Sequence, residues 1–189
     1  MSDQFSLFAP EPITDRLFFA IFPDPPTASR IAEQAGRLRT AHQLSGRPLA
    51  AERFHITLHH LGDHAGLRRD IVAMAGEAAQ AMTASPFEVT FDRAVSFHNG
   101  GNNPLVLRGD EGLEALKAFQ HGLGLAMARA GLGRLVDKTF TPHVTMLYDG
   151  RAVAEESMAP MTWTVSGFTL VHSRLGRTEH VPLARWTLG

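Results

Sequence analysis

The sequence predicts an α+β fold, in which an antiparallel or mixed sheet carries helices on one side. Short apolar runs of strand length alternate with three longer segments of helical periodicity, roughly in the order βαβαββαβββ. Short, hairpin-like links join many of the strands, which favours antiparallel pairing over a doubly wound parallel sheet. A histidine-containing tetrapeptide also occurs twice, about half a chain apart, which indicates two duplicated lobes.

The first half of the chain is predicted to supply two strands and two helices. Residues 16–22 are apolar, rich in phenylalanine and closed by prolines, which is typical of a short buried strand. Residues 27–44 place apolar side chains at helical spacing among charged ones. Residues 54–64 read as the next strand, and the alanine-rich segment 65–82 has one apolar side and is predicted to be helical.

The second half is predicted to supply five strands and one helix. Residues 86–97 alternate between apolar and polar side chains, as a strand with one polar face does. The loop 98–103 is rich in glycine and asparagine, and 104–109 returns to strand character. A helix over 111–131 ends at glycines. The remaining strands are predicted at 140–149, 162–175 and 180–188.

Length and composition restrict the classes of function. At 189 residues and 44% hydrophobic content, the chain fits one large domain or two lobes that share a core. We expect an N-terminal arm over 1–15 and a single bilobal domain over 16–189. The 18 basic side chains are balanced by 19 acidic ones, so no positive field exists to hold a long nucleic acid. Any polyanion is expected to bind locally, at one phosphate or at a chain end.

The residue types that are missing exclude several kinds of site. No cysteine is present, which rules out disulfides, thiolate zinc sites and cysteine nucleophiles, whereas zinc held by histidine and carboxylate remains open. The first residues contain acidic side chains and prolines where a secretory signal needs a basic start and an apolar run. We therefore expect a cytoplasmic protein that needs no cofactor, no membrane and no protein partner, and that is a monomer.

The repeated tetrapeptide is the main functional signal. It reads His55-Ile56-Thr57-Leu58 in the first half and His143-Val144-Thr145-Met146 in the second, 88 positions apart. Side chains alternate along a strand, so each histidine shares a face with its threonine while the apolar pair faces the core. If the two strands meet across a pseudo-twofold axis, two imidazoles and two hydroxyls converge on one small cavity.

Such a cavity suits a phosphate diester. Imidazole titrates near pH 6.5, so one neutral histidine can take a proton while a second, protonated one gives a proton to the departing oxygen. Threonine hydroxyls can donate hydrogen bonds to the non-bridging oxygens of the phosphate. Acid–base catalysis of this kind requires no metal.

These motifs resemble those of a known family. The two His-x-Thr-x tetrads, the "FTPH" before the second one, the opening "RLFFAIFP" and the closing "LVHSRL" and "HVPLARWTL" are similar to the 2H phosphoesterase superfamily. Within it, they resemble the RNA 2',3'-cyclic phosphodiesterases, also called 2'-5' RNA ligase-like proteins. The resemblance extends from about residue 16 to residue 188.

The resemblance implies a bilobal fold, with two pseudo-symmetric lobes that each carry a mainly antiparallel sheet and flanking helices around a central cleft. It also implies metal-independent opening of a 2',3'-cyclic phosphate at an RNA end or on a small cyclic nucleotide. By this similarity His55 is the general acid and His143 the base that activates water, and Thr57 and Thr145 hold the phosphoryl oxygens. The sequence does not orient the substrate, so the two histidine roles could be exchanged.

One position departs from the family pattern. Many RNA-processing members have arginine five residues after the second histidine, where this chain has Tyr148. A phenol donates one hydrogen bond but lacks the charge of a guanidinium. We expect Tyr148, Phe22 and His59 to join the threonines in binding substrate. Strict alternation sends Tyr148 to the face opposite His143, so its role requires the strand to end or bulge there.

Two alternatives remain open. The first is a non-catalytic module that binds RNA ends or nucleotides in the same cleft. The second is a metal hydrolase that uses His55, His59 and His64, although the stretch reads as a strand and lacks the glutamate of the helical zinc-protease motif.

Overall fold

The chain folds into two four-stranded antiparallel sheets with three main helices. The structure is a computed structural model that describes residues 11–177 and 179–189. The strands are β1 (Asp15–Ile21), β2 (Ile56–His64), β3 (Phe87–Ser96), β4 (Asn103–Arg108), β5 (Val144–Asp149), β6 (Glu156–Val165), β7 (Gly167–Arg174) and β8 (Glu179–Thr187). The helices are α1 (Pro25–Ala41), α2 (Arg69–Gln80) and α3 (Glu114–Met127), with short turns η2 (Ala51–Arg53), η3 (Ala128–Leu132) and η4 (Gly133–Leu135).

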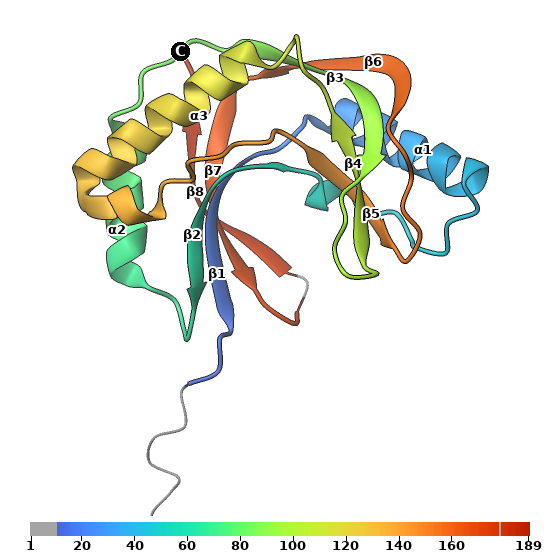
Figure 1. The fold of residues 1–189 in the computed structure, drawn as a ribbon. Coiled ribbons are helices and arrows are strands. Elements are labelled where there is room, and N and C mark those ends of the chain that lie inside the picture. Colours follow the sequence, from blue (N-terminus) through green and yellow to red (C-terminus); the bar gives the residue numbers. More distant parts are fainter. Residues whose placement is uncertain (1–10, 178) are drawn as a thin grey trace, which may run out of the picture.

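Each sheet combines strands that are distant in sequence. The first sheet has the order β2-β1-β7-β8, and the second has the order β5-β4-β3-β6. Every strand pair is antiparallel, which confirms the predicted α+β class (Figure 1). The first sheet therefore combines strands from the two ends of the described chain. The middle of the chain forms the second sheet.

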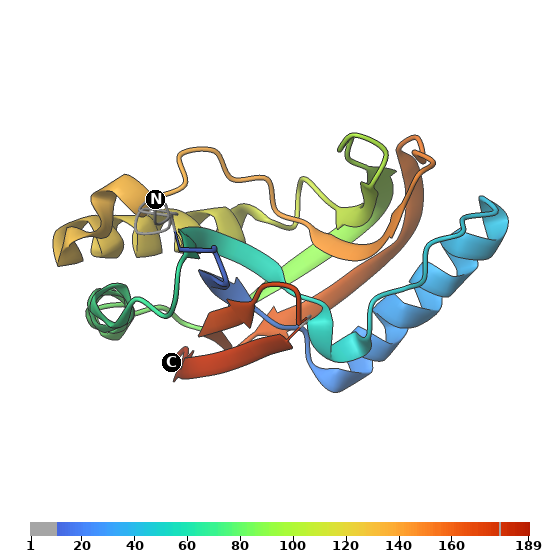
Figure 2. The same cartoon turned by 90° about the horizontal axis from the view of Figure 1, so that it is seen from below.

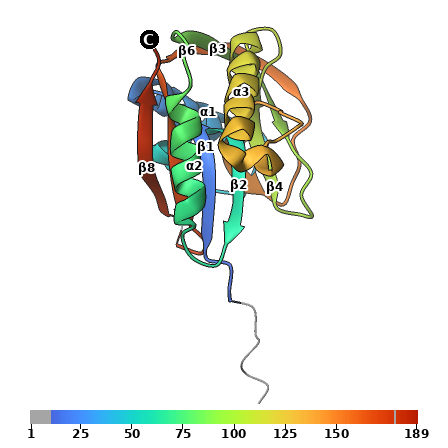
Figure 3. The ribbon, with the colours of Figure 1, turned by 90° about the vertical axis from the view of Figure 1, so that its left-hand side faces the viewer.

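The helices lie at opposite ends of the molecule. Helices α2 and α3 pack against each other beside the first sheet, and α1 lies beside the second (Figures 1 and 3). Helix α1 follows β1 of the first sheet but contacts β5 of the second, whereas α3 follows β4 of the second sheet and also contacts β2 of the first. Viewed from below, both sheets lie between these helical ends (Figure 2). No helix of the described residues is long and apolar enough to cross a membrane.

The two sheets share one apolar core. Side chains of the first sheet, such as Ile56, belong to the same buried cluster as Val144 of the second sheet, Ile31 of α1 and Leu123 of α3. At about 25 cal/mol per Å² of buried apolar surface, this shared cluster opposes separation of the lobes. The lobes therefore form a single unit rather than two domains on a linker.

The fold contains an internal repeat. In the unit β1-α1-β2, the last strand lies at the edge of its sheet and pairs with the strand before the helix. The unit β4-α3-β5 repeats this arrangement in the second sheet. Both tetrapeptides begin immediately before the edge strand of their unit, so the duplicated pattern of the sequence corresponds to a duplicated piece of structure.

The structure differs from the sequence-based expectations in three respects. The helices cover two separate sheets, as the family resemblance implied, rather than one side of a single sheet as the order of elements alone suggested. The predicted strand 162–175 is two strands, because the chain passes from the second sheet to the first at Ser166. Strand β6 also begins earlier than expected, at Glu156; its Pro160 is tolerated because β6 is an edge strand.

Several element ends also shift. The first three residues of the predicted helix 111–131 precede α3, and the predicted strand 140–149 is regular only from Val144. Most of the predicted N-terminal arm lies outside the described residues, and its last residue, Asp15, already belongs to β1.

Candidate active site

The two motif histidines occupy equivalent positions and are held in the same way. His55 and His143 each precede the first residue of an edge strand, β2 and β5 respectively. The Nδ1 atom of His55 lies 2.7 Å from the backbone oxygen of Arg53, and that of His143 lies 2.7 Å from the backbone oxygen of Thr141. A carbonyl oxygen only accepts, so Nδ1–H donates in both rings. Each ring therefore keeps Nε2 for a substrate.

The threonines lie next to the histidines on the same side of the strands. Thr57 and Thr145 are half-buried, whereas the residues that flank each of them are buried in the core. This alternation is the period of two that the sequence predicted. Each lobe thus presents one imidazole and one hydroxyl from a backbone that is fixed by its apolar side.

A β-bulge interrupts both motif strands at the same place. In the pairing of β1 with β2, the register shifts at Leu58, and in the pairing of β4 with β5 it shifts at Met146. A bulge inserts one residue and reverses the alternation beyond it. The side chains that follow each bulge therefore exchange faces relative to a regular strand.

The bulge at Leu58 overturns the expectation that His59 lines the cleft. His59 is fully buried, its Nε2–H donates to the backbone oxygen of Gln120 (2.9 Å), and its Nδ1 accepts from the backbone N–H of Asp137 (3.2 Å). Burial lowers the pKa of this imidazole, so it remains neutral. His59 is thus a core residue that ties β2 to α3 and to the segment before β5.

The second bulge explains how Tyr148 can take part in the site. Its side chain is 42% exposed rather than buried with Met146 and Leu147. It lies within electrostatic range of Arg16, which belongs to the other sheet. Tyr148 therefore lies on the exposed side of β5, because the strand bulges at Met146.

His55 is surrounded by aromatic and imidazole rings. Its ring centroid lies 5.2 Å from that of Phe18, 5.8 Å from Phe22 and 5.3 Å from His180. Burial is the main reason that the pKa of His55 falls to about 4, with further lowering by the charges of His180 and His143. Because His143 acts on His55, the two motif imidazoles lie within electrostatic range across the sheets.

The surroundings of His143 are different. Phe97 contacts its ring edge-on, with centroids 5.1 Å apart. Burial lowers the pKa of His143, and the positive charge of Arg108 lowers it further. Arg108 follows Leu107, whose partner in β5 is the residue after His143, so the antiparallel register brings the guanidinium beside the imidazole.

A cavity of about 270 Å³ lies at the first motif. Its walls include two of the expected site residues, His55 and Thr57, but not His143 or Thr145. Its other walls are residues that sequence reasoning did not assign to the site: Arg16, Phe18, His60, Ser173 and His180. His60 takes the place expected of His59, since the bulge turns it outward.

A bidentate ion pair holds Arg16, one of the side chains that line this cavity. The Nε and Nη2 groups of Arg16 donate to the two oxygens of Asp63 (2.6 and 2.7 Å), and His60 contacts the same carboxylate at 3.0 Å. Arg16 is the main reason that the pKa of Asp63 falls to about 2. Asp63 therefore stays ionised and holds both basic side chains in place.

The three histidines of the metal alternative do not form one group. His59 is occupied by its core hydrogen bonds, and Nε2 of His64 contacts the backbone oxygen of Leu61 at 3.0 Å. Within residues 11–177 and 179–189, no group of three or more histidine, aspartate or glutamate side chains is arranged to hold a metal ion. Of the three, His55 lines the cavity of about 270 Å³, whereas His59 and His64 do not.

Known proteins are similar to this chain in both sequence and fold. The RNA 2',3'-cyclic phosphodiesterase of Escherichia coli K12 is 32% identical over 180 residues, which cover 92% of this chain and 96% of the relative. The crystal structure of E. coli LigT in its apo form superposes with a TM-score of 0.69 at 30% identity, covering 92% and 97% of the two chains. LigT complexed with 3'-AMP gives a TM-score of 0.68 at 30% identity, with 93% and 98% covered.

A more distant structure, from Thermus thermophilus, shares the fold with a TM-score of 0.69 at 24% identity and covers 92% of this chain and 97% of its own. The family model of the 2'-5' RNA ligase superfamily matches residues 25–177, a span that contains both tetrapeptides. With this match and the extent of the E. coli similarity, the chain belongs to the 2'-5' RNA ligase superfamily, the 2H phosphoesterases.

Proposed function

We propose that this protein hydrolyses a 2',3'-cyclic phosphate, at an RNA end or on a small cyclic nucleotide, by paired histidine catalysis without a metal. The observation that carries the proposal is the identical fixation of two imidazoles, each with Nδ1 held by the backbone oxygen two residues earlier and Nε2 left for substrate. The E. coli relative, named as an RNA 2',3'-cyclic phosphodiesterase, supports the choice of substrate.

The proposed reaction needs one proton removed and one supplied. Nε2 of His143 takes a proton from water as the water oxygen forms its bond to phosphorus. The bond from phosphorus to one ribose oxygen breaks, and Nε2–H of His55 protonates that oxygen. The products are a phosphomonoester and a free ribose hydroxyl, and a proton moves from His143 back to His55 through solvent.

The pKa of His55 is compatible with this cycle when the charge of the bound substrate is taken into account. With its pKa at about 4, His55 is neutral at physiological pH before substrate binds. A bound phosphoryl anion favours the imidazolium form and raises that pKa. His55 therefore acquires its catalytic proton together with the substrate, and Thr57 and Thr145 donate to the charge that develops on the phosphoryl oxygens.

The direct test is turnover of 2',3'-cyclic AMP and of an RNA oligomer that ends in a 2',3'-cyclic phosphate, by protein treated with EDTA. His55→Ala and His143→Ala should each lose about 100- to 10,000-fold in kcat, which is the usual contribution of a general acid or base. His121→Ala is the matched control, because His121 is exposed on α3.

Two other outcomes would indicate a different function. Activity that disappears with EDTA and returns with zinc would favour a metal hydrolase. Nucleotide binding that survives both histidine substitutions, with no product from either substrate, would identify a non-catalytic binding module.

A further inference from the structure

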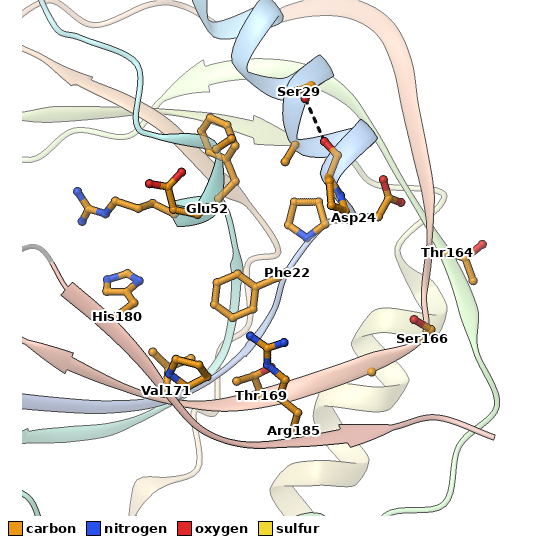
Figure 4. A pocket seen from close by; sticks show the side chains of 18 of the residues that line it. Phe22, Asp24, Ser29, Glu52, Thr164, Ser166, Thr169, Val171, His180 and Arg185 are labelled. Atoms are coloured by element: carbon orange, nitrogen blue, oxygen red, sulfur yellow. Dashed lines mark hydrogen bonds between the residues drawn. The ribbon is translucent and has the colours of Figure 1, made fainter.

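A second and larger cavity, of about 930 Å³, adjoins the first, because His180 lines both. Figure 4 shows this larger cavity. It is bounded by the loop that enters α1, by η2, by the junction of β6 and β7, and by β8. Its volume is in the range of pockets that hold drug-sized molecules. None of the residues that line this cavity takes part in the proposed hydrolysis.

The large cavity adjoins the motif histidine of the first lobe. His180 lines both cavities, and its ring lies 5.3 Å from that of His55. Phe22 lines the large cavity and lies 5.8 Å from the same imidazole. A molecule whose phosphate reaches His55 can therefore place its remaining part in this cavity.

The walls fit an uncharged, aromatic occupant with hydroxyl groups. Figure 4 shows the ring of Phe22 at the centre of the cavity, with Arg185 extending toward it. Three hydroxyl side chains line the end next to the junction of the sheets: Thr164, Ser166 and Thr169. Flat rings that stack on aromatic side chains, next to a few hydrogen-bonding groups, are how proteins hold nucleobases.

The charges of the walls argue against a second phosphate in this cavity. Two arginines, Arg53 and Arg185, are outnumbered by three carboxylates, Asp24, Glu52 and Glu179. The remaining basic group, His180, has a pKa lowered mainly by burial, so it is neutral at physiological pH. The cavity therefore offers no net positive charge that would attract a further phosphate of an RNA backbone.

The other lobe has different chemistry at the equivalent position. Phe22 follows Ile21, whose partner in β2 is the residue after His55. Arg108 follows Leu107, whose partner in β5 is the residue after His143. At this register position the first lobe thus has the ring of Phe22 and the second the guanidinium of Arg108, while Phe97 also contacts His143 edge-on. This difference favours a nucleotide that places its base toward Phe22 and its charge toward Arg108.

We propose that the large cavity binds the nucleoside that carries the cyclic phosphate, with its base against Phe22 and its ribose beside His180 and His55. This inference rests on the proposed function and adds the direction in which the substrate lies. In this arrangement the protein recognises a single nucleoside. RNA ends and small cyclic nucleotides therefore bind in the same pocket.

The test compares the binding of 3'-AMP with that of inorganic phosphate by isothermal titration calorimetry. Phe22→Ala should weaken 3'-AMP by roughly 5- to 100-fold, the usual loss on removal of a stacking partner, and leave phosphate unchanged. Phe22→Trp should restore 3'-AMP affinity. Phe87→Ala is the matched control, because Phe87 is also partly buried but packs against Phe119, outside both cavities.

A second variant tests the cavity without touching the neighbours of His55. Ser29 lines it from α1, so Ser29→Trp should occupy part of it and weaken the binding of 3'-AMP by at least about 5-fold, with phosphate binding again unaffected. Arg30→Trp is its control, since Arg30 is exposed on the same helix and does not line the cavity.

The outcomes separate the pocket from the chemistry. Unchanged 3'-AMP affinity in both Phe22→Ala and Ser29→Trp overturns the pocket, even if the wild-type protein hydrolyses cyclic nucleotides. Equal weakening of 3'-AMP and phosphate also overturns it, because the ring would then act only through His55. Conversely, selective loss of 3'-AMP affinity supports the pocket even in a protein that releases no product.

Discussion

The sheet that holds His55 and the sheet that holds His143 share a backbone plan but differ in the side chains around the histidine. In both, an edge strand follows a helix, the preceding residue is the histidine, and Nδ1 is held at 2.7 Å by the backbone oxygen two residues earlier. In both, a bulge follows the threonine. The repeated part is therefore the part that presents Nε2 and a hydroxyl to the same substrate group.

The difference begins one residue beyond the last residue pair that each motif strand forms with its neighbour. At equivalent positions the first lobe has Phe22 and the second Arg108, and beyond the bulges the first has His60 and the second Tyr148. The first lobe also places His180 against its motif histidine. A symmetric pair of imidazoles has no direction by itself, so these unequal neighbours must determine how a substrate lies between them.

The comparison can be tested most strongly at Arg108. Arg108→Met keeps a long side chain but removes the charge beside His143, and we expect kcat/KM for 2',3'-cyclic AMP to fall by about 100-fold, since oriented charge at a reacting phosphate supplies several kcal/mol. The pKa of His143 should rise, because the charge of Arg108 lowers it in the native protein. Steady-state kinetics over pH 5–9 measures both effects.

Arg129→Met, at an exposed position beyond α3, is the control for this substitution. If Arg108→Met and Arg129→Met behaved alike, the second lobe would owe nothing to its arginine, and the asymmetry between the lobes would have no functional meaning.

The sequence was sufficient to identify the repeated part of the molecule. Period-two alternation placed each histidine and threonine on one face, and the two tetrapeptides indicated two equivalent units. These features are local, so four consecutive residues contain the information. The predicted α+β class was confirmed for the same reason, since strand and helix periods are local properties.

The residues that distinguish the lobes could not be predicted in this way. His180 meets His55 only because β8 adds to the sheet through β7, a long-range pairing that no local pattern reveals. His59 was assigned to the wrong face, because a single bulged residue at Leu58 reverses the alternation. The sequence alternation "HVPLARW" suggested a strand, yet it did not indicate which sheet the strand joins.

The core position of His59 gives the next test, since the equivalent residue in the other lobe is Leu147. His59→Leu removes the hydrogen bond that Nε2–H donates to the backbone oxygen of Gln120 and leaves the N–H of Asp137 without its imidazole acceptor. It should destabilise the protein by about 1–3 kcal/mol at pH 8. Urea unfolding at pH 8 and at pH 5.5 measures the loss.

The loss of stability caused by His59→Leu should be smaller at pH 5.5 than at pH 8. Because burial lowers the pKa of His59, the unfolded chain binds more protons than the native one below about pH 6.5, and the wild type loses stability as pH falls. The leucine variant lacks this proton uptake. A deficit that grew between pH 8 and pH 5.5 would contradict a neutral, structural histidine.

The influence of His180 on His55 gives a smaller effect. His180→Phe keeps a ring beside the imidazole but removes its charge, so the pKa of His55 should rise from about 4. NMR titration of the His55 ring protons reports this change directly. The exposed His121→Phe should leave the titration as it is, and an unaltered pKa in His180→Phe would show that burial and the other basic groups account for the lowering.

The smallest effect is expected at Tyr148, which is 42% exposed. Tyr148→Phe removes one hydroxyl donor that is open to water, so kcat/KM for 2',3'-cyclic AMP should fall only about 2- to 5-fold. Tyr148→Arg is more informative, because it restores the guanidinium that many related RNA-processing proteins carry there.

The charge introduced by Tyr148→Arg would face Arg16 across the lobes, and like charges so placed repel each other unless an anion lies between them. Affinity for RNA ends should therefore rise several-fold at low salt and lose this gain near 0.5 M salt, where charges are screened. Affinity for RNA that was independent of salt in Tyr148→Arg would place Tyr148 outside the phosphate site and leave Arg108 as the second lobe's contribution.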